Sequence, residues 1–156
     1  MMDLVIRLAT ANDLNDIVKL LAKGKLNHEG IAQHVEHFLV VEKGGEVVGT
    51  AGWEKIGQDY GLLRSLALDA SVWNTKVVLD LLQILLKTAE EKAVQEVFLL
   101  TGSAVELFEW VGFQPVNPEE IPHEVKQSAH FQQAKARLST VMRYAQVDNQ
   151  RKTLLN

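Results

Sequence analysis

The side chains best suited to chemistry stand in the apolar run LLRSLALD, where Arg64 and Ser65 are neighbours. The run is typical of a buried strand, and alternation along a strand predicts that Arg64 points to the face opposite Ser65. A guanidinium on a mostly apolar strand needs an anionic partner, because burying it unpaired costs several kcal/mol. Within the chain, the candidate partners are the carboxylates of Glu54, Glu106 and Glu109.

The histidines are dispersed along the chain. None of the five has the i, i+4 spacing or the companion carboxylates of a metal site, and the pattern favours surface positions for His28, His34, His37, His123 and His130. There is no cysteine, which excludes disulfides, thiolate metal sites and a cysteine nucleophile. We therefore predict no metal centre.

Composition narrows the class of protein. Hydrophobic residues make up 47% and charged residues 23% of the chain, as in ordinary soluble globular proteins. The formal net charge of −4 gives no reason to expect nucleic acid or an anionic membrane as a partner. The run VVLDLLQILL is too short and too polar to span a bilayer, and no secretory signal precedes the first strand. We predict a cytoplasmic protein that binds neither nucleic acid nor membrane.

The pattern of apolar residues and turn formers predicts one domain over residues 1–145 and a polar tail over 146–156. The clearest signal is a hairpin in which FLVVEK and EVVGTAGWEK are joined at Gly44-Gly45, a pair that accepts positive φ. The predicted strands cover 3–8, 38–43, 46–55, 60–69, 97–101, 113–116 and 138–145. The predicted helices cover 14–23, 27–36, 74–93, 103–110 and 118–127.

The order of these elements is β-α-α-β-β-β-α-β-α-β-α-β. An antiparallel meander followed by β-α units predicts an α/β (α+β) fold with a mixed, mostly antiparallel sheet and helices on both faces.

Four segments, read in this order, resemble the GNAT superfamily of N-acetyltransferases over nearly the whole chain: IRLATANDLNDIVKLL, VVEKGGEVVGTAGW, LLRSLALD and AVELFEWVGFQPV. The segments VFLLTGSAVELFEWVGFQPVNPEEIP and STVMRY are most similar to the branch that contains N-acetylglutamate synthase domains and arsenic-resistance acetyltransferases. Members of that branch usually carry Cys-Pro before the last strand, where this chain has Lys135-Ala136.

The resemblance implies acetyl-CoA as cofactor. The pantetheine would bind the backbone of Leu66 and Leu68, and the pyrophosphate would lie at the helix start formed by Asn74, Thr75, Lys76, Val77 and Val78. The family signature Gln/Arg-x-x-Gly-x-Gly/Ala is altered here, with Trp73, Lys76 and Val78 at the signature positions. Lys76 and Thr75 could contact phosphate instead. The alternative is an ordinary helix start, with Asn74 or Thr75 as the cap and the two valines in the core.

The resemblance also implies catalytic positions, and several are changed. Leu62 stands near the glutamate that commonly acts as base, so a displaced base would be Glu54, Asp59 or Tyr60; otherwise these three are loop or strand-surface residues. Phe108, assigned to the cofactor site, occupies the position of a tyrosine that protonates the CoA thiolate.

Substrate contacts are assigned to Arg64 and Ser65, because in relatives that acetylate amino acids an arginine could bind the substrate carboxylate. For Arg64 the alternative is the internal ion pair described above.

Two functions follow. The first is an acetyl-CoA-dependent N-acetyltransferase that acts on the amine of a small molecule, with a carboxylate on that molecule as one option. The second is an inactive GNAT-fold binding or assembly module that has lost acetyl-CoA binding and could form a homodimer.

Overall fold

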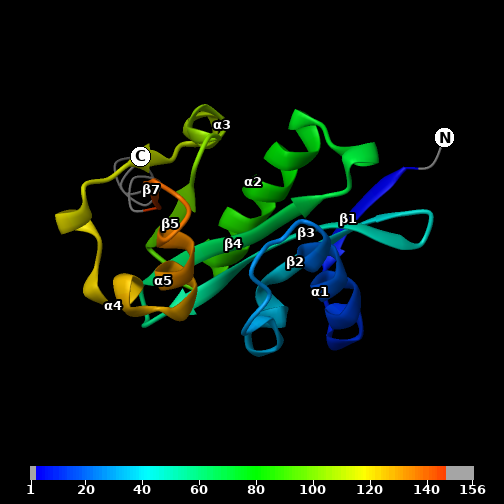
Figure 1. The fold of residues 1–156 in the computed structure, drawn as a ribbon, viewed down its shortest axis with the longest axis horizontal. Coiled ribbons are helices and arrows are strands. Elements are labelled where there is room, and N and C mark those ends of the chain that lie inside the picture. Colours follow the sequence, from blue (N-terminus) through cyan, green and yellow to red (C-terminus); the bar gives the residue numbers. More distant parts are fainter. Residues whose placement is uncertain (1–2, 147–156) are drawn as a thin grey trace, which may run out of the picture. The chain divides into compact units, whose positions relative to one another are not determined.

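The computed structural model describes residues 3–146. It contains a seven-stranded mixed sheet in the order β1-β2-β3-β4-β5-β7-β6, so the predicted fold class is confirmed (Figure 1). The strands are β1 Leu4–Leu8, β2 Phe38–Lys43, β3 Glu46–Ile56, β4 Tyr60–Leu68, β5 Glu96–Thr101, β6 Gln114–Pro115 and β7 Thr140–Ala145. The α-helices are α1 Leu14–Lys23, α2 Thr75–Glu91, α3 Val105–Val111, α4 His123–Gln127 and α5 Ala129–Lys135.

Within the described residues the chain divides into two compact units. The first unit comprises residues 3–54 and 64–88, and the second comprises 55–63 and 89–146. The first unit therefore holds β1, β2, α1, most of β3, the second half of β4 and nearly all of α2. The second unit holds the first half of β4, β5 and every element that follows.

The first unit has a helix on each face of its strands. A Cβ on Gly52 would lie 2.5 Å from ring carbons of Phe38, whose side chain shares a core cluster with Ile17 and Leu21 of α1. The next residue, Trp53, points to the opposite face because side chains alternate along a strand. There its Nε1 donates a hydrogen bond to Oγ1 of Thr88 in α2, at 3.1 Å. Figure 1 shows β2 and β3 between these two helices.

The predicted hairpin of this unit is confirmed. β2 and β3 pair antiparallel around Gly44 and Gly45, whose φ angles are 59° and 84°. These values lie in the left-handed region, which glycine enters without a steric cost.

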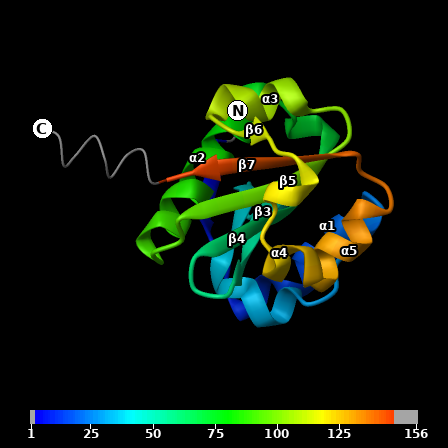
Figure 2. The same ribbon diagram turned by 90° about the vertical axis from the view of Figure 1, so that its left-hand side faces the viewer.

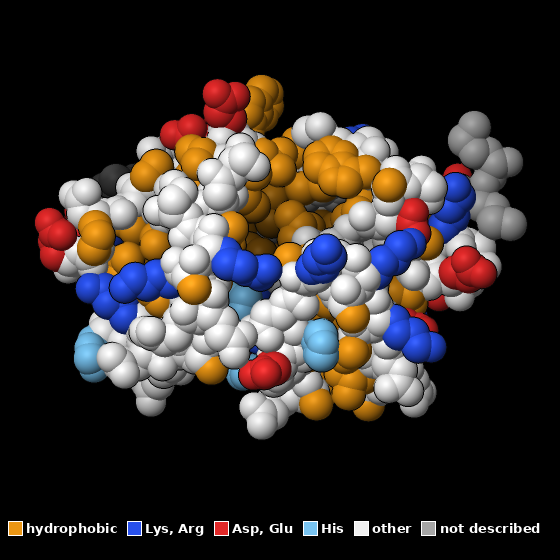
Figure 3. All heavy atoms as spheres, viewed as in Figure 1, with side chains coloured by type: hydrophobic (Ala, Val, Ile, Leu, Met, Phe, Trp, Pro, Cys, Tyr) orange, Lys and Arg blue, Asp and Glu red, His pale blue; other side chains and the backbone are white. Residues whose placement is uncertain are grey.

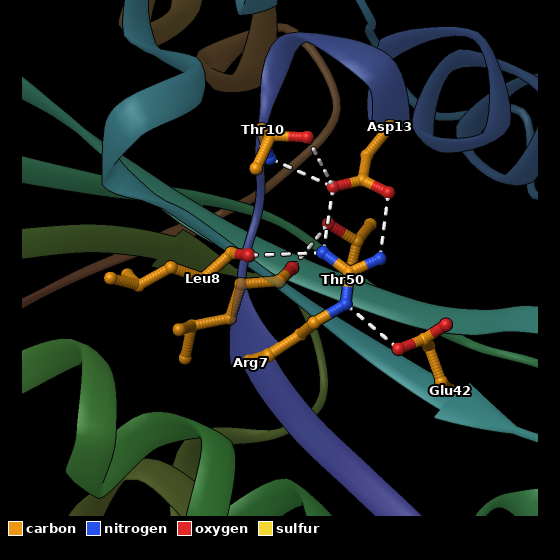
Figure 4. Close-up of polar contacts among 7 residues, drawn as sticks. Arg7, Leu8, Thr10, Asp13, Glu42 and Thr50 are labelled. Atoms are coloured by element: carbon orange, nitrogen blue, oxygen red, sulfur yellow. Dashed lines mark hydrogen bonds and ion pairs between the residues drawn. The ribbon is translucent and has the colours of Figure 1, made fainter. Parts of the chain in front are cut away.

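An ion-pair network joins β1, β2 and the start of α1 (Figure 4). Nη1 and Nη2 of Arg7 each donate to one carboxylate oxygen of Asp13 at 2.8 Å, and its Nε donates to Glu42 at 2.8 Å. The Asp13 carboxylate also accepts the backbone N–H of Thr10 at 2.8 Å. Hydrogen bonds from Arg7 hold the pKa of Asp13 well below its ordinary value, even though burial opposes this shift. Asp13 is 6% exposed, so the pair is shielded from solvent on the carboxylate side.

The second unit is built around β5 and β7, which pair antiparallel along six residues. Figure 2 shows these two strands side by side. The two-residue strand β6 pairs with β7 at the edge of the sheet, which agrees with the edge position expected from Pro115. The core of this unit contains Leu62, Phe98, Ile121, Val125 and Phe131.

Three predictions for the helices need correction. The helix expected at 27–36 is a 3-10 helix, Ile31–His37. The helix expected at 118–127 is broken into a 3-10 turn, Pro118–Glu120, and α4, because Pro122 forces the residue before it into an extended conformation. Helix α5 was not predicted. Ser128 caps it by accepting the N–H of Phe131, but it buries only Phe131 and Ala134, which is too weak a periodic signal to recognise in the sequence. The predicted tail, apart from Gln146, lies outside the described residues.

Candidate functional site

Strand β4 contains a strained residue. Ser65 has a φ of 65° and is buried, although it is neither glycine nor asparagine. Such backbone conformations cost of order 1–3 kcal/mol and concentrate at functional sites. In the parallel ladder with β5, β4 is paired from Tyr60 to Leu62, although the strand itself continues to Leu68. The strained residue therefore lies beyond the part of β4 that pairs with β5.

The conformation of Ser65 overturns one expectation from the sequence. Arg64 and Ser65 do not point to opposite faces, because Nε of Arg64 donates a hydrogen bond to Oγ of Ser65 at 3.0 Å. Positive φ interrupts the alternation of side chains along a strand, and neighbouring side chains can then meet.

Arg64 is fully engaged within the first unit. Its Nη1 donates to Oε2 of Glu54 at 3.0 Å and its Nη2 donates to the carbonyl oxygen of Asn27 at 3.1 Å. The Arg64 side chain is only 2% exposed. Among the three carboxylates named from the sequence, the structure therefore pairs Arg64 with Glu54. This pair meets the requirement that a buried guanidinium has an anionic partner.

The second carboxylate oxygen of Glu54 approaches a histidine. Nε2 of His34 lies 3.5 Å from Oε1 of Glu54, and the His34 side chain is 24% exposed. His34 is thus half-buried and lies against a carboxylate, so it is not simply a surface residue. Sequence reasoning missed this contact because the two residues are distant in the chain and share no recognisable spacing.

A second histidine packs close by. The ring of His37 stacks on Trp53 with the centroids 4.0 Å apart and the planes 8° from parallel. Its side chain is 10% exposed, so a surface position does not describe His37 either.

The other two predicted catalytic residues belong to the second unit. Asp59 is exposed, and its carbonyl oxygen accepts the backbone N–H groups of Gln95 and Glu96. Tyr60 packs edge-on against Phe98 with the ring centroids 6.1 Å apart. Burial, and then the charge of Glu96, raise the pKa of Tyr60 above its ordinary value. The three candidates for a base are therefore divided between the units, with Glu54 in the first.

The predicted phosphate site is the start of α2. Oδ1 of Asn74 accepts the N–H of Val77 at 2.9 Å, so Asn74 caps the helix. Val77 and Val78 are buried, and Nζ of Lys76 pairs with Asp80 at 3.0 Å on the exposed side of the helix. These contacts are those expected for the ordinary helix start. Thr75 and Lys76 are the first two residues of α2, where backbone N–H groups have no acceptor in the preceding turn of the helix itself.

The remaining positions assigned to the cofactor are Leu66, Leu68 and Phe108. Both leucines are half-buried and follow Ser65 on β4. Phe108 lies in α3 of the second unit and packs edge-on against Phe113 with the ring centroids 6.0 Å apart. The assigned roles of these residues stay predictions.

Hydrophobic side chains also reach the surface, as Figure 3 shows for one face. The largest are Trp73, 54% exposed, and Trp110, 84% exposed. No helix in the described part of the chain has the length and apolar character needed to cross a membrane. Residues 3–146 include no cluster of three or more His, Asp or Glu side chains placed to hold a metal ion.

Comparison with known proteins identifies the family of this chain. Residues 11–113 match the model of the acetyltransferase (GNAT) family. The uncharacterized protein YwlB of Bacillus subtilis (strain 168) is 29% identical over 129 residues, which cover 81% of this chain and 86% of YwlB.

Among solved structures, Rv2747 from Mycobacterium tuberculosis in complex with CoA and NLQ is similar, with a TM-score of 0.75 and 22% identity. The match covers 90% of this chain and 98% of that one. N-acetylglutamate synthase from Neisseria gonorrhoeae, complexed with coenzyme A and N-acetyl-glutamate, has a TM-score of 0.74 and 20% identity. That match covers 92% of this chain but only 35% of the synthase chain. These likenesses show the fold. The family model covers more than half of the sequence, and the chain belongs to the GNAT acetyltransferase family.

Proposed function

We propose that this protein is an N-acetyltransferase that moves an acetyl group from acetyl-CoA to the amine of a small molecule. The observation that carries the proposal is the conformation of β4 at Ser65, in a chain of the GNAT family. Two similar structures contain coenzyme A, which supports an acyl-CoA donor.

The cofactor would be held largely by backbone groups. We assign the pantetheine amides to the backbone of Leu66 and Leu68, which follow the strained residue. The pyrophosphate would accept the two N–H groups at the start of α2, those of Thr75 and Lys76, where the helix dipole also favours an anion. The Lys76 side chain is 83% exposed, so its amino group can turn from Asp80 to a phosphate oxygen.

The reaction needs a base, because an amine attacks a thioester only in its unprotonated form. Of the three residues considered from the sequence, Glu54 has the best support. It is the one held in a fixed position by an arginine and next to a histidine. Asp59, by contrast, is exposed at a turn, and the raised pKa of Tyr60 keeps its phenol protonated at neutral pH.

We infer that the acceptor is a small amine that carries a carboxylate, because the similar synthase structure contains N-acetyl-glutamate. Arg64, which the sequence assigns to that carboxylate, is buried and already holds Glu54, so it would support acceptor binding through the position of Glu54. Arg64→Ala should therefore weaken acceptor binding and leave the affinity for acetyl-CoA unchanged. An equal loss of both affinities would reject the assigned role of Arg64.

One observation favours the second function, an inactive module. The start of α2 carries the buried Val78 and a Lys76 that is paired to Asp80 at the two positions where the family signature has small residues. If these side chains block the diphosphate, acetyl-CoA does not bind and the fold serves for binding or assembly. Sedimentation would then show whether that module is a homodimer.

Calorimetric titration with acetyl-CoA separates the two functions. Binding supports the enzyme, whereas no heat and no thermal shift at millimolar acetyl-CoA would exclude it. Turnover can be followed by the free thiol of released CoA, because the chain has no cysteine and adds no thiol background.

A matched pair of variants then tests the phosphate contact. Lys76→Ala should weaken acetyl-CoA binding several-fold, while Lys87→Ala, which removes the same charge further along α2, should not. If the two variants bind acetyl-CoA equally well, Lys76 does not hold the phosphate.

A further inference from the structure

The structure assigns a role to a residue that the family resemblance did not name. We propose that His34 accepts the proton of the acceptor amine, that Glu54 orients the imidazole, and that Arg64 fixes Glu54. This inference rests on the proposed N-acetyltransferase function and replaces Glu54 alone with the pair Glu54–His34 as the base.

The three side chains form a series from the interior to the solvent. The Arg64 side chain is 2% exposed, that of Glu54 is 14% exposed and that of His34 is 24% exposed. Oε2 of Glu54 accepts from Arg64 at 3.0 Å, and Oε1 faces Nε2 of His34 at 3.5 Å. Both oxygens of the carboxylate are thus directed at protein partners. The imidazole is the member of the series that a small molecule can reach.

This arrangement matches the requirements of a histidine base. A carboxylate next to one ring nitrogen keeps the proton on that nitrogen, so the other nitrogen is left with a lone pair. With Nε2 toward Glu54, the accepting atom is Nδ1. Once Nδ1 takes a proton, the positive ring lies next to the negative carboxylate of Glu54. Ordinary imidazole also titrates closer to neutral pH than a carboxyl group, which suits proton transfer from an ammonium group.

The ring of His37 also lies near His34, with the two ring centroids 6.5 Å apart. His37 is stacked on Trp53, and its Nε2 lies 3.7 Å from Oε1 of Glu36. The recorded contacts of His34 are thus with Glu54, which Arg64 holds from behind, and with the titratable ring of His37.

The position of the pair on the fold also fits. Arg64 donates to Ser65, the strained residue of β4, and to the carbonyl oxygen of Asn27 in the loop that leads to His34. The same guanidinium therefore links the segment that carries the imidazole to Ser65, which directly precedes the strand segment assigned to the pantetheine amides. Because one buried side chain holds both segments, their relative geometry would be fixed, as proton transfer requires.

The acceptor ammonium gives one proton to Nδ1 of His34 and becomes a free amine. The amine nitrogen attacks the thioester carbonyl, the C–N bond forms, and the C–S bond breaks with its electron pair going to sulfur. The proton that nitrogen sheds on forming the amide neutralises the CoA thiolate. His34 then releases its proton to water.

The test compares His34→Gln with His28→Gln, an exposed histidine of the same unit. The probe is acetyl-CoA with each of the twenty amino acids as acceptor, and the fastest wild-type reaction is used. His34→Gln should lower kcat/KM by about 10²-fold or more and abolish the fall of the rate on the acidic side of the pH profile. Acetyl-CoA affinity should be unchanged in calorimetry, and His28→Gln should match the wild type. Added imidazole should restore part of the rate of His34→Ala, which a purely structural defect would not allow.

The outcomes are distinct. If the wild type turns over and His34→Gln keeps its rate and pH profile, the role of His34 is rejected while the acetyltransferase remains. If His34→Gln is slow but His34→Ala does not respond to imidazole and the acidic limb persists, His34 is structural and the inference also fails. If the wild type releases no CoA with any acceptor, the proposed function falls and the inference falls with it.

Discussion

Asp13→Asn should destabilise the fold strongly, because it removes the charge at the centre of the network that joins β1, β2 and α1. The wild-type carboxylate accepts two hydrogen bonds from Arg7 and one from the backbone of Thr10, all at 2.8 Å. The amide of asparagine has one accepting oxygen, and its NH₂ group would face donors on Arg7 or Thr10. Arg7 would keep its bond to Glu42.

The size of the effect follows from the exposure of the two partners. Removing one member of a buried ion pair costs about 3–5 kcal/mol, and an exposed pair contributes about 0–1 kcal/mol. Here the carboxylate side chain is 9% exposed and that of Arg7 is 35% exposed, so the pair is intermediate. We expect a loss of about 2–3 kcal/mol in the free energy of unfolding, which for a chain of this size lowers Tm by roughly 5–10 °C.

The pH dependence has a defined sign. The pKa of Asp13 is lowered in the folded state, so its contribution to stability is present above the unfolded pKa and is lost as pH falls through the folded pKa. The difference in free energy of unfolding between wild type and Asp13→Asn should be about 1 kcal/mol smaller at pH 3 than at pH 7. Urea denaturation at both pH values measures this gap.

The matched control is Asp16→Asn, which removes an exposed carboxylate from the first turn of α1. It should cost only about 0.3–1 kcal/mol, through the helix dipole. Equal destabilisation by the two variants at pH 7, or a gap for Asp13→Asn that does not change with pH, would refute the reasoning.

Two further predictions concern packing and the alkaline side of the pH range. Gly52→Ala places a Cβ 2.5 Å from the ring of Phe38 and should lower the free energy of unfolding, measured by urea denaturation, by about 1–3 kcal/mol. Gly24→Ala is the control, because its Cβ would have its nearest neighbour 3.7 Å away, and it should cost much less. Equal losses for the two variants would contradict the close contact. Burial raises the pKa of Tyr60 in the folded protein. The neutral phenol therefore contributes to stability at pH values below about 10, which is the ordinary pKa of tyrosine. This contribution is lost as the pH rises through the raised pKa of the folded state. The tyrosinate absorbance that the wild type shows and Tyr60→Phe lacks should therefore rise with a midpoint above pH 10. A midpoint at or below pH 10 would show that Tyr60 is not shielded.

Much of the fold could be predicted from the sequence because its signals are local. The hairpin at Gly44-Gly45, the periodicity of α2 and the β-branched run of β5 each specify an element within a few residues. The prediction of helices failed where the local signal was weak or mixed. Pro122 interrupts a segment that otherwise resembles one helix, and the short α5 after Ser128 has little periodicity.

The candidate site depended far more on tertiary structure. The sequence established that Arg64 needs an anionic partner, that the start of α2 lacks the usual small residues and that no cysteine can take part. Only the fold decided that the partner is Glu54, that His34 lies against the same carboxylate and that Ser65 adopts positive φ. The physical reason is that an ion pair or a strained backbone angle is set by the packing of segments distant in the chain, whereas periodicity and turn chemistry are set by neighbours.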